Sequence, residues 1–352
     1  MNEALQNESD RLTRSWQRHD AAMLREYLVA GVEDPRLNVQ SILTRHFLAC
    51  AVFGQRFQDV MHAELQFAVA MNWLLAVSAE ATDPEAWAAI GAALASGADN
   101  AEGIAIPASI RRIHQSLPAT IHGQPVPDYL AEAARIRASG VVPAPGTPSG
   151  LDTFMRLWRT VLAGEAAADP PLSVVEPACG SANDYRCLEA CRLSRFLDYT
   201  GFDLSEKNVA NARSLFPATR FVVGNALEIA AGDRAFDHGF VHDLFEHLSA
   251  EALEVAVSEL CRVTRGGLCL GFFQMDEVDE HVIRPVDEYH VNTLSLARML
   301  ALFARHGFAG EAVHIGTFLR LRFGCEQTPN PNAYTLVLER RGIEDLPGES
   351  RA

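Results

Sequence analysis

The 352-residue sequence has no long run of basic residues, no CxxC pair of cysteines and no uninterrupted apolar stretch of membrane-spanning length. Its formal net charge is −15, from 30 Lys and Arg against 45 Asp and Glu. A nucleic-acid groove needs clustered basic side chains to neutralise phosphates, and a transmembrane helix needs about 18 consecutive apolar residues. We therefore expect neither a nucleic acid nor a membrane as partner. The acidic balance favours small molecules that are neutral or cationic.

The cysteines and the first residues of the chain predict a compartment. Seven cysteines lie mostly within apolar patterns, where free thiols usually pack as small hydrophobic side chains. Residues 1–10 lack the basic region and apolar core of a signal peptide. We therefore expect a protein of the reducing cytoplasm. Its length and its 48% hydrophobic content allow a large core and two domains.

The periodicity of apolar residues changes along the chain. Residues 1–142 show helical spacing, which predicts an N-terminal all-helical domain. Residues 143–150 are dense in Pro and Gly and are interpreted as a linker. Strands and helices then alternate over residues 151–342, a pattern typical of an α/β domain with a parallel sheet. Residues 343–352 are expected to form a flexible tail.

Seven strands are expected in the second domain, over residues 173–177, 197–204, 220–223, 236–242, 268–273, 311–323 and 333–339. Residues 265–267 are interpreted as a turn before the fifth strand. The last two strands follow one another without a helix between them. This predicts an antiparallel end to an otherwise parallel sheet.

Residues 174–184 contain a buried strand, Glu176, a turn of small residues and a helix start. Ligands of open α/β sheets bind at the carboxyl ends of strands, and small residues let the backbone approach a ligand closely. Asp203 ends the next strand, where an acid can accept the hydroxyls of a ribose. Asn225 ends the third strand and can bond to an adenine edge, although a simple turn is an equal alternative. The combination favours a nucleoside cofactor over a tight turn without a ligand.

These residues resemble the class I S-adenosylmethionine (SAM)-dependent methyltransferases. Residues 176–182 are similar to the first motif of that family, 201–203 to its ribose-binding acid, and 236–248 to its fourth strand and the turn after it. The resemblance covers about residues 151 to 340 and implies a Rossmann-like, seven-stranded sheet with SAM as cofactor and methyl donor. The sequence departs from the family at Ala178 and Ala182, which replace glycines, and at Asn225, which replaces an acid. The residues expected to hold SAM are Glu176, Ala178, Gly180, Asn183, Asp184, Asp203, Leu204, Asn225 and Ala226.

A second group of residues is expected around the reaction centre. The segment 242–247 follows the fourth strand and offers Asp243 and His247 as proton-transfer groups. The acidic segment 274–292 offers Tyr289 and His290. Tyr185, which follows the first motif, is expected to face the sulfonium through a cation–π contact. The spacing of the histidines and carboxylates in segment 274–292 matches no closed tetrahedral pattern, so no metal is expected.

Three functions remain open at this point. The first is methyl transfer to an O, N or C atom of a small molecule. The second uses the amino-acid arm of SAM, as in azetidine-2-carboxylate synthases, which release methylthioadenosine, or in aminocarboxypropyl transferases. The third is a non-catalytic SAM-binding interaction protein. The sequence leaves the acceptor, the role of the helical region and a homodimeric state undecided.

Overall fold

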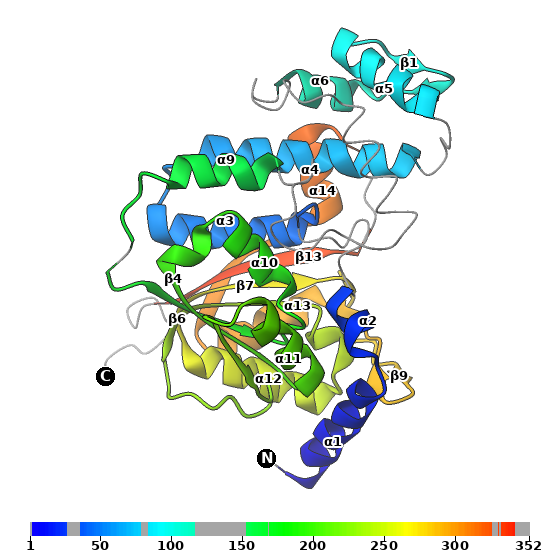
Figure 1. Cartoon of the computed structure of the whole chain (residues 1–352). Coiled ribbons are helices and arrows are strands. Elements are labelled where there is room, and N and C mark those ends of the chain that lie inside the picture. The colour runs from blue at the N-terminus through cyan, green and yellow to red at the C-terminus, as the bar shows by residue number, and fades with distance from the viewer. Residues whose placement is uncertain are drawn as a thin grey trace, which may run out of the picture.

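The computed structural model describes residues 2–26, 36–78, 84–116, 153–167, 169–325, 330 and 332–341. The predicted linker and the predicted tail lie outside these residues. The described chain forms one large sheet with helices on both faces (Figure 1). None of the described helices is long and apolar enough to cross a membrane.

The central sheet has seven strands in the order β12-β13-β7-β6-β3-β4-β5. Strands β3 to β7 run parallel where they pair, and β13 runs antiparallel to both β7 and β12. The predicted α/β class, the seven strands and the antiparallel end are confirmed. The strands are β3 (Leu172–Pro177), β4 (Leu197–Asp203), β5 (Arg220–Val223), β6 (Phe236–His242), β7 (Thr264–Phe272), β12 (Phe308–His314) and β13 (Tyr334–Arg340).

The order of the strands positions a crevice. From β3 the chain proceeds outward through β4 to β5, then returns to β6 on the other side of β3. This is the switch point of an open sheet, and ligands of such sheets bind outside the strand ends there. The ends of β3 and β6 therefore border the expected site.

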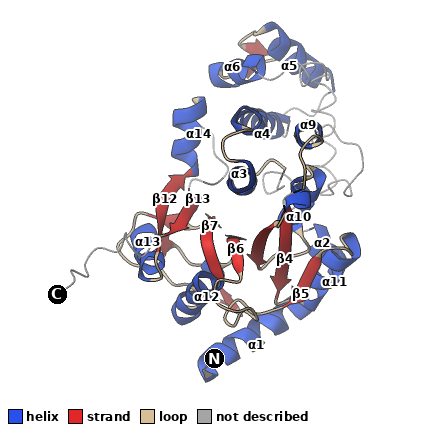
Figure 2. Ribbon diagram, turned by 90° about the vertical axis from the view of Figure 1, so that its left-hand side faces the viewer, coloured by secondary structure: helices blue, strands red, loops and turns tan. Residues whose placement is uncertain are grey.

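Helices cover both faces of the sheet (Figure 2). Helices α12 and α13 share a buried apolar cluster on one face, and α3, α9 and α10 share another cluster on the opposite face. The described α-helices from residue 153 onward are α9 (Thr153–Leu162), which precedes β3, and then α10 (Asn183–Ala190), α11 (Glu206–Leu215), α12 (Ala250–Val263), α13 (Leu296–Arg305) and α14 (Ile315–Phe323).

The N-terminal helices are α1 (Glu3–Gln17), α2 (Ala21–Glu26), α3 (Val39–Phe53), α4 (Gln58–Ser78), α5 (Pro84–Ser96) and α6 (Ala108–Ser116). A short hairpin of β1 (Asn100–Ala101) and β2 (Ile104–Ala105) interrupts the helical pattern that the sequence predicted. Helix α3 packs on β7 and β13, while α2 packs on α11. Helices α2 and α3 thus contact the sheet domain at separate places. The division into two domains stays a prediction.

Two expected elements differ from the structure. Residues 265–267 continue β7 instead of forming a turn, because Gly267 pairs with His238 on one side and Glu339 on the other. Residues 315–323 form helix α14 instead of a strand. The His314 side chain accepts a hydrogen bond from the Thr317 amide at the start of this helix, and Gly324 ends it with φ 65°.

Candidate functional site

The turn between β3 and α10 has an unusual backbone. Ala178, Gly180 and Ala182 have φ values of 55°, 55° and 69°, in the left-handed region that glycine adopts without strain and that is costly for most residues with a Cβ atom. The Cys179 amide donates to the Phe202 carbonyl oxygen at 3.1 Å, which ties the turn to the end of β4. The backbone of this turn therefore suits glycine, and Ala178 and Ala182, which replace glycines of the family, hold the same conformation.

Asp203 joins this turn to the start of α11. Its carboxylate accepts hydrogen bonds from the Gly180 amide (3.0 Å), the Ser205 amide (2.8 Å) and the Asn208 side chain (3.2 Å). Burial raises the pKa of Asp203, and the three donors partly offset that effect. A carboxylate has about four acceptor positions, so one remains for a ribose hydroxyl where the sequence suggested two. Leu204, the next predicted cofactor residue, is half-buried.

Glu176 lies at the end of β3 and is buried. The Tyr199 hydroxyl, from β4, donates a hydrogen bond to its carboxyl group. Burial raises the pKa of Glu176 well above its ordinary value, and the nearby carboxylates of Asp184 and Asp203 add to the rise. Sequence reasoning missed Tyr199, because its phenol looked like one more apolar group of the strand.

Asn183 and Asp184 begin α10. Asn183 is 6% exposed, and among the described residues its Oδ1 atom is buried without a hydrogen-bond partner. Asp184 Oδ2 lies 2.9 Å from His242 Nδ1, at the end of β6. Burial acts to raise the pKa of Asp184, but the interaction with His242 outweighs it and the pKa is lowered. Sequence reasoning considered His242 and left it out of the site.

Helix α1 reaches the predicted adenine residues. Asn225 Nδ2 donates to Ser9 Oγ at 2.9 Å, while Asn225 Oδ1 accepts from the Leu227 amide at 2.9 Å. Glu8, on the same helix, accepts a hydrogen bond from the Ser249 amide at 2.8 Å, at the start of α12. Ala226 is half-buried beside these groups. The family resemblance does not reach α1, so this boundary of the site was not foreseen.

Asp243 and His247 form an acid–base pair after β6. His247 Nε2 lies 3.0 Å from Asp243 Oδ1, and His247 Nδ1 lies 2.9 Å from the His290 carbonyl oxygen. Burial acts to lower the pKa of His247, but the Asp243 carboxylate outweighs it and raises the pKa to about 9. The two side chains are 35% and 29% exposed for His247 and Asp243, so the pair can be reached from solvent.

A hairpin brings the last two predicted residues to this pair. Strands β9 (Pro285–Val286) and β10 (Tyr289–His290) pair antiparallel, and the Tyr289 ring lies 5.8 Å from the His247 ring in an edge-on arrangement. The His290 ring is buried, and its Nδ1 atom has no partner among the described residues. The structure therefore brings together four of the five residues expected at the reaction centre.

Glu246 also belongs to this region, although sequence reasoning did not select it. It is 1% exposed, and its Oε1 atom accepts a hydrogen bond from the Phe273 amide at 2.7 Å. Burial and the charge of Asp243 raise the pKa of Glu246 to about 7. The signal available in the sequence was a carboxylate between Phe245 and His247, in a turn that otherwise buries apolar residues.

Tyr185 is not placed with the expected reaction-centre residues. Its ring packs against Tyr199 and Phe221 at centroid distances of 4.5 Å and 5.5 Å, and its hydroxyl is 2.8 Å from Thr219 Oγ1. The side chain points from α10 toward β4 and β5, away from Asp243 and His247. A tyrosine can pack in a core or line a site. Here Tyr185 lies on the face of α10 that packs on the sheet, so it belongs to the core.

The described part of the chain shows no group of three or more His, Cys, Asp or Glu residues that could hold a metal ion. His281, one of the residues considered for a metal, instead accepts a hydrogen bond from the Ser295 amide at 3.0 Å.

A comparison with protein families matches residues 175–270 to the family described as a methyltransferase domain. The match begins in β3, includes the 178–182 turn, Asp203 and the Asp243–His247 pair, and ends in β7. Together with the strand order, it decides the assignment. This part of the chain belongs to the class I methyltransferase superfamily.

No curated protein matches the chain. Among solved structures, the methyltransferase domain is similar to the Burkholderia thailandensis 1,6-didemethyltoxoflavin-N1-methyltransferase, with 16% identity, coverage of 53% of this chain and 77% of that one, and a TM-score of 0.37. It is also similar to the magnesium protoporphyrin IX methyltransferase of Synechocystis, with 16% identity, coverage of 53% and 79%, and a TM-score of 0.36.

Proposed function

We propose that this protein transfers a methyl group from SAM to an O, N or C atom of a small acceptor molecule. The observation that carries the proposal is the Asp243–His247 pair, which stands beside the switch point of a methyltransferase sheet and is open to solvent. When bound, SAM supplies a methyl group already activated by the sulfonium. The protein therefore contributes mainly by positioning and by handling one proton.

The residues at the switch point fit this cofactor. The small residues of the 178–182 turn leave the backbone accessible, and Asp203 keeps one acceptor position for a ribose hydroxyl. The Oδ1 atom of Asn183, buried and without a partner among the described residues, offers an acceptor to the amino-acid arm. We assign Gly180, Asn183 and Asp184 to the arm, Asp203 and Leu204 to the ribose, and Asn225 with Ala226 to the adenine.

His247 is the group we assign to the proton. In the neutral ring Nδ1–H donates to the His290 carbonyl oxygen, so Nε2 accepts the proton that the acceptor loses, and the Asp243 carboxylate, 3.0 Å from Nε2, then stabilises the resulting cation. The His290 carbonyl oxygen fixes the orientation of the ring. A His247 pKa of about 9 is close to the pKa of a phenol or an amine, so the free energy of proton transfer from such an acceptor to His247 is close to zero.

The acceptor we expect is neutral or cationic, because the chain carries a net charge of −15 and the Asp243 carboxylate is 29% exposed. Nucleic acids and membranes are disfavoured on the same charge and hydropathy grounds, and we retain the cytoplasm as the expected compartment. Chemistry on the amino-acid arm remains the second candidate, because Asn183 and Asp184 lie where the arm is expected. The burial of Tyr185 in the aromatic core removes one group on which that alternative relied.

The test begins with purified protein and SAM without an acceptor, followed by mass spectrometry of the products. Methylthioadenosine would overturn methyl transfer in favour of arm chemistry. The same reaction is then run with a panel of phenols and primary amines, and S-adenosylhomocysteine is measured. Formation of S-adenosylhomocysteine together with a methylated acceptor supports the proposal.

His247→Gln should abolish most of this turnover, while His306→Gln, at the end of α13, should not. SAM binding without turnover of any acceptor would favour a non-catalytic protein. No SAM binding would refute the cofactor assignment.

A further inference from the structure

Helix α3 carries four buried polar residues where a helix packed on a sheet normally carries apolar ones. Gln40, Ser41, Thr44 and Arg45 are each 6% exposed or less. Buried polar groups are costly unless they are hydrogen-bonded, so their partners identify what the helix is built to hold. Gln40 Nε2 donates to the carbonyl oxygens of Phe272 (3.1 Å) and Tyr334 (2.7 Å), which attaches α3 to the ends of β7 and β13.

Thr44 begins a chain of hydrogen bonds that ends at the predicted cofactor site. Its hydroxyl lies 3.3 Å from Cys269 Sγ and 2.9 Å from His242 Nε2, and His242 Nδ1 lies 2.9 Å from Asp184 Oδ2. One consistent direction has the Cys269 thiol donating to Thr44, Thr44 to His242, and His242 to Asp184. The Ser41 side chain, on the same helix, also helps to lower the pKa of Asp184. The hydrogen-bonded chain from α3 thus ends at one carboxylate.

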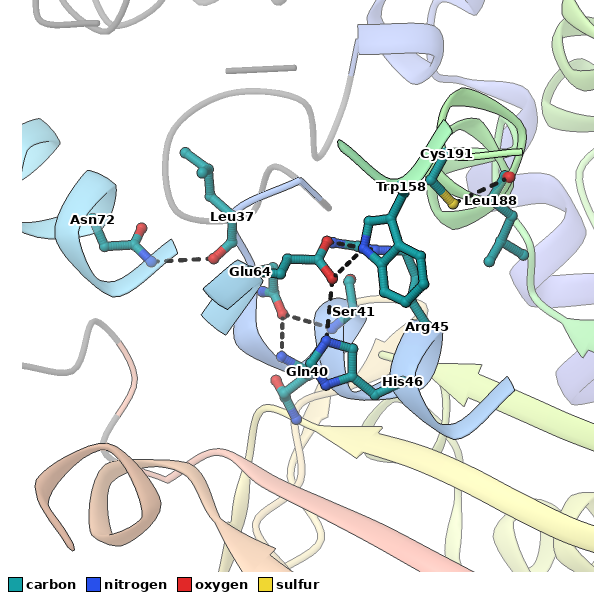
Figure 3. Close-up of polar contacts among 11 residues, drawn as sticks. Leu37, Gln40, Ser41, Arg45, His46, Glu64, Asn72, Trp158, Leu188 and Cys191 are labelled. Atoms are coloured by element: carbon teal, nitrogen blue, oxygen red, sulfur yellow. Dashed lines mark hydrogen bonds and ion pairs between the residues drawn. The ribbon is translucent and has the colours of Figure 1, made fainter. Parts of the chain in front are cut away.

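A buried network fixes α3 in place (Figure 3). Arg45, next to Thr44, donates to Glu64 of α4 at 2.8 Å. The same carboxylate accepts a hydrogen bond from Trp158 Nε1 of α9 at 3.1 Å and lies 3.1 Å from His46 Nε2. Figure 3 shows Arg45 and His46 from α3 and Trp158 from α9 meeting at Glu64. Burial acts to raise the pKa of Glu64, but Arg45 outweighs it and lowers the pKa to about 2. The helix that presents Ser41 and Thr44 therefore has little freedom to shift.

We propose that α3 is part of the cofactor site, and that Thr44, through His242, is a positioning residue that orients Asp184 toward the cationic amino group of SAM. This inference rests on the proposed function. It extends the site to the N-terminal helices, which the methyltransferase family match does not include.

Two further observations support an amino group as the partner of Asp184. Asp184 lies in the first turn of α10, directly after the 178–182 turn, and its side chain is 14% exposed. The neighbouring Asn183 carries the buried Oδ1 atom without a partner among the described residues. A carboxylate and an amide oxygen are both hydrogen-bond acceptors, which suits an ammonium group with three donors and no acceptor.

The experiment compares two ligands in titration calorimetry. S-adenosylhomocysteine carries the amino-acid arm, and methylthioadenosine lacks it. Thr44→Val removes the hydroxyl with little change of shape. We expect it to weaken S-adenosylhomocysteine binding about five- to tenfold and to leave methylthioadenosine binding unchanged, because the loss of one hydrogen bond acts on the arm alone.

Two further variants keep the inference falsifiable. Thr44→Ser restores the hydroxyl and should restore binding. Thr160→Val makes the same change at an exposed position of α9 and should bind both ligands as the wild type does. Equal weakening of both ligands, or no change in either, would overturn the inference while leaving the proposed function standing. Failure of the wild type to bind either ligand would instead refute the proposed function.

Discussion

The Tyr199 hydroxyl reaches the Glu176 carboxyl group by passing over Gly201. Glu176 and Gly201 are direct partners in the pairing of β3 with β4. A Cβ atom built on Gly201 would lie 2.6 Å from the Tyr199 hydroxyl oxygen and 2.9 Å from the Phe221 ring. The absence of a side chain at position 201 therefore makes room for the hydrogen bond that holds the carboxylate of the first motif.

Replacing Tyr199 with Phe should weaken S-adenosylhomocysteine binding about tenfold, as expected when a hydrogen bond to a charged group is lost. The pKa of Glu176 is already raised by burial, and losing the phenol raises it further, so the carboxyl group is ionised only at higher pH. The deficit should therefore grow as the pH is lowered, which titration calorimetry at a series of pH values measures. Tyr334→Phe, on β13, serves as control. A deficit that does not vary with pH would show that Glu176 does not act through its charge.

Gly201→Ala should reduce the free energy of unfolding by about 1 to 3 kcal/mol, because the new methyl group overlaps a packed aromatic cluster. Urea denaturation of the variant measures the loss. Gly232→Ala is the matched control, since a Cβ atom there meets nothing within 4 Å. Equal stability of the two variants would mean that the Tyr199 and Phe221 rings shift freely.

Asp243→Asn tests the pair at the reaction centre. Asn tolerates the left-handed backbone of this position, where φ is 52°, so the geometry is retained while the charge is lost. The pKa of His247 is raised to about 9 by Asp243, so the stabilisation from the pair is complete below the unfolded value of about 6.5 and disappears as the pH rises through 9. Thermal melts should show a lower Tm for the variant at about pH 6, and nearly equal values at about pH 10.

The Asp243 charge stabilises the folded protein at low pH, whereas it shifts activity to higher pH. Because the neutral form of His247 accepts the proton, wild-type turnover should rise with pH up to about 9, and Asp243→Asn should move this rise to lower pH. A rate profile that is identical in the two proteins would rule out His247 as the proton acceptor.

Asp203→Asn should reduce both stability and cofactor affinity. An amide oxygen cannot replace both carboxylate oxygens, so either the Gly180 or the Ser205 amide loses its partner, at a cost of about 1 to 3 kcal/mol. The 178–182 turn would then be less firmly held, and we expect weaker S-adenosylhomocysteine binding together with a lower urea midpoint. Asp198→Asn, at an exposed position of the same strand, should change neither quantity.

The strand ends of the site were predictable because each combines an apolar run with a polar terminal residue. Glu176, Asp203 and Asn225 follow this pattern, and the parallel arrangement brings the three ends to one edge of the sheet. The start of α12 can also be read from local sequence, because Ser249 is a favourable N-cap before an apolar periodic segment.

Contacts between distant segments could not be predicted from local patterns. Thr44 and His242 are 198 residues apart in the chain, and each looks like an ordinary helix or strand residue by itself. The orientation of Tyr185 could not be predicted either. The sequence shows that it follows Asp184, but the face of α10 that meets the core depends on the sheet beneath the helix. The α14 helix was missed because the apolar residues 315–323 suit a strand as well as a buried helix.

The position of β13 has a consequence for how the protein is made. This strand is inserted between β7 and β12, both of which precede it in the chain, and it pairs with each along most of its length. While the ribosome is still adding residues before 334, β7 and β12 cannot be joined, and each presents an unpaired strand edge that invites aggregation. Completion of the sheet is therefore a late event in synthesis, and a nascent chain halted before Arg340 would need a chaperone to shield those edges.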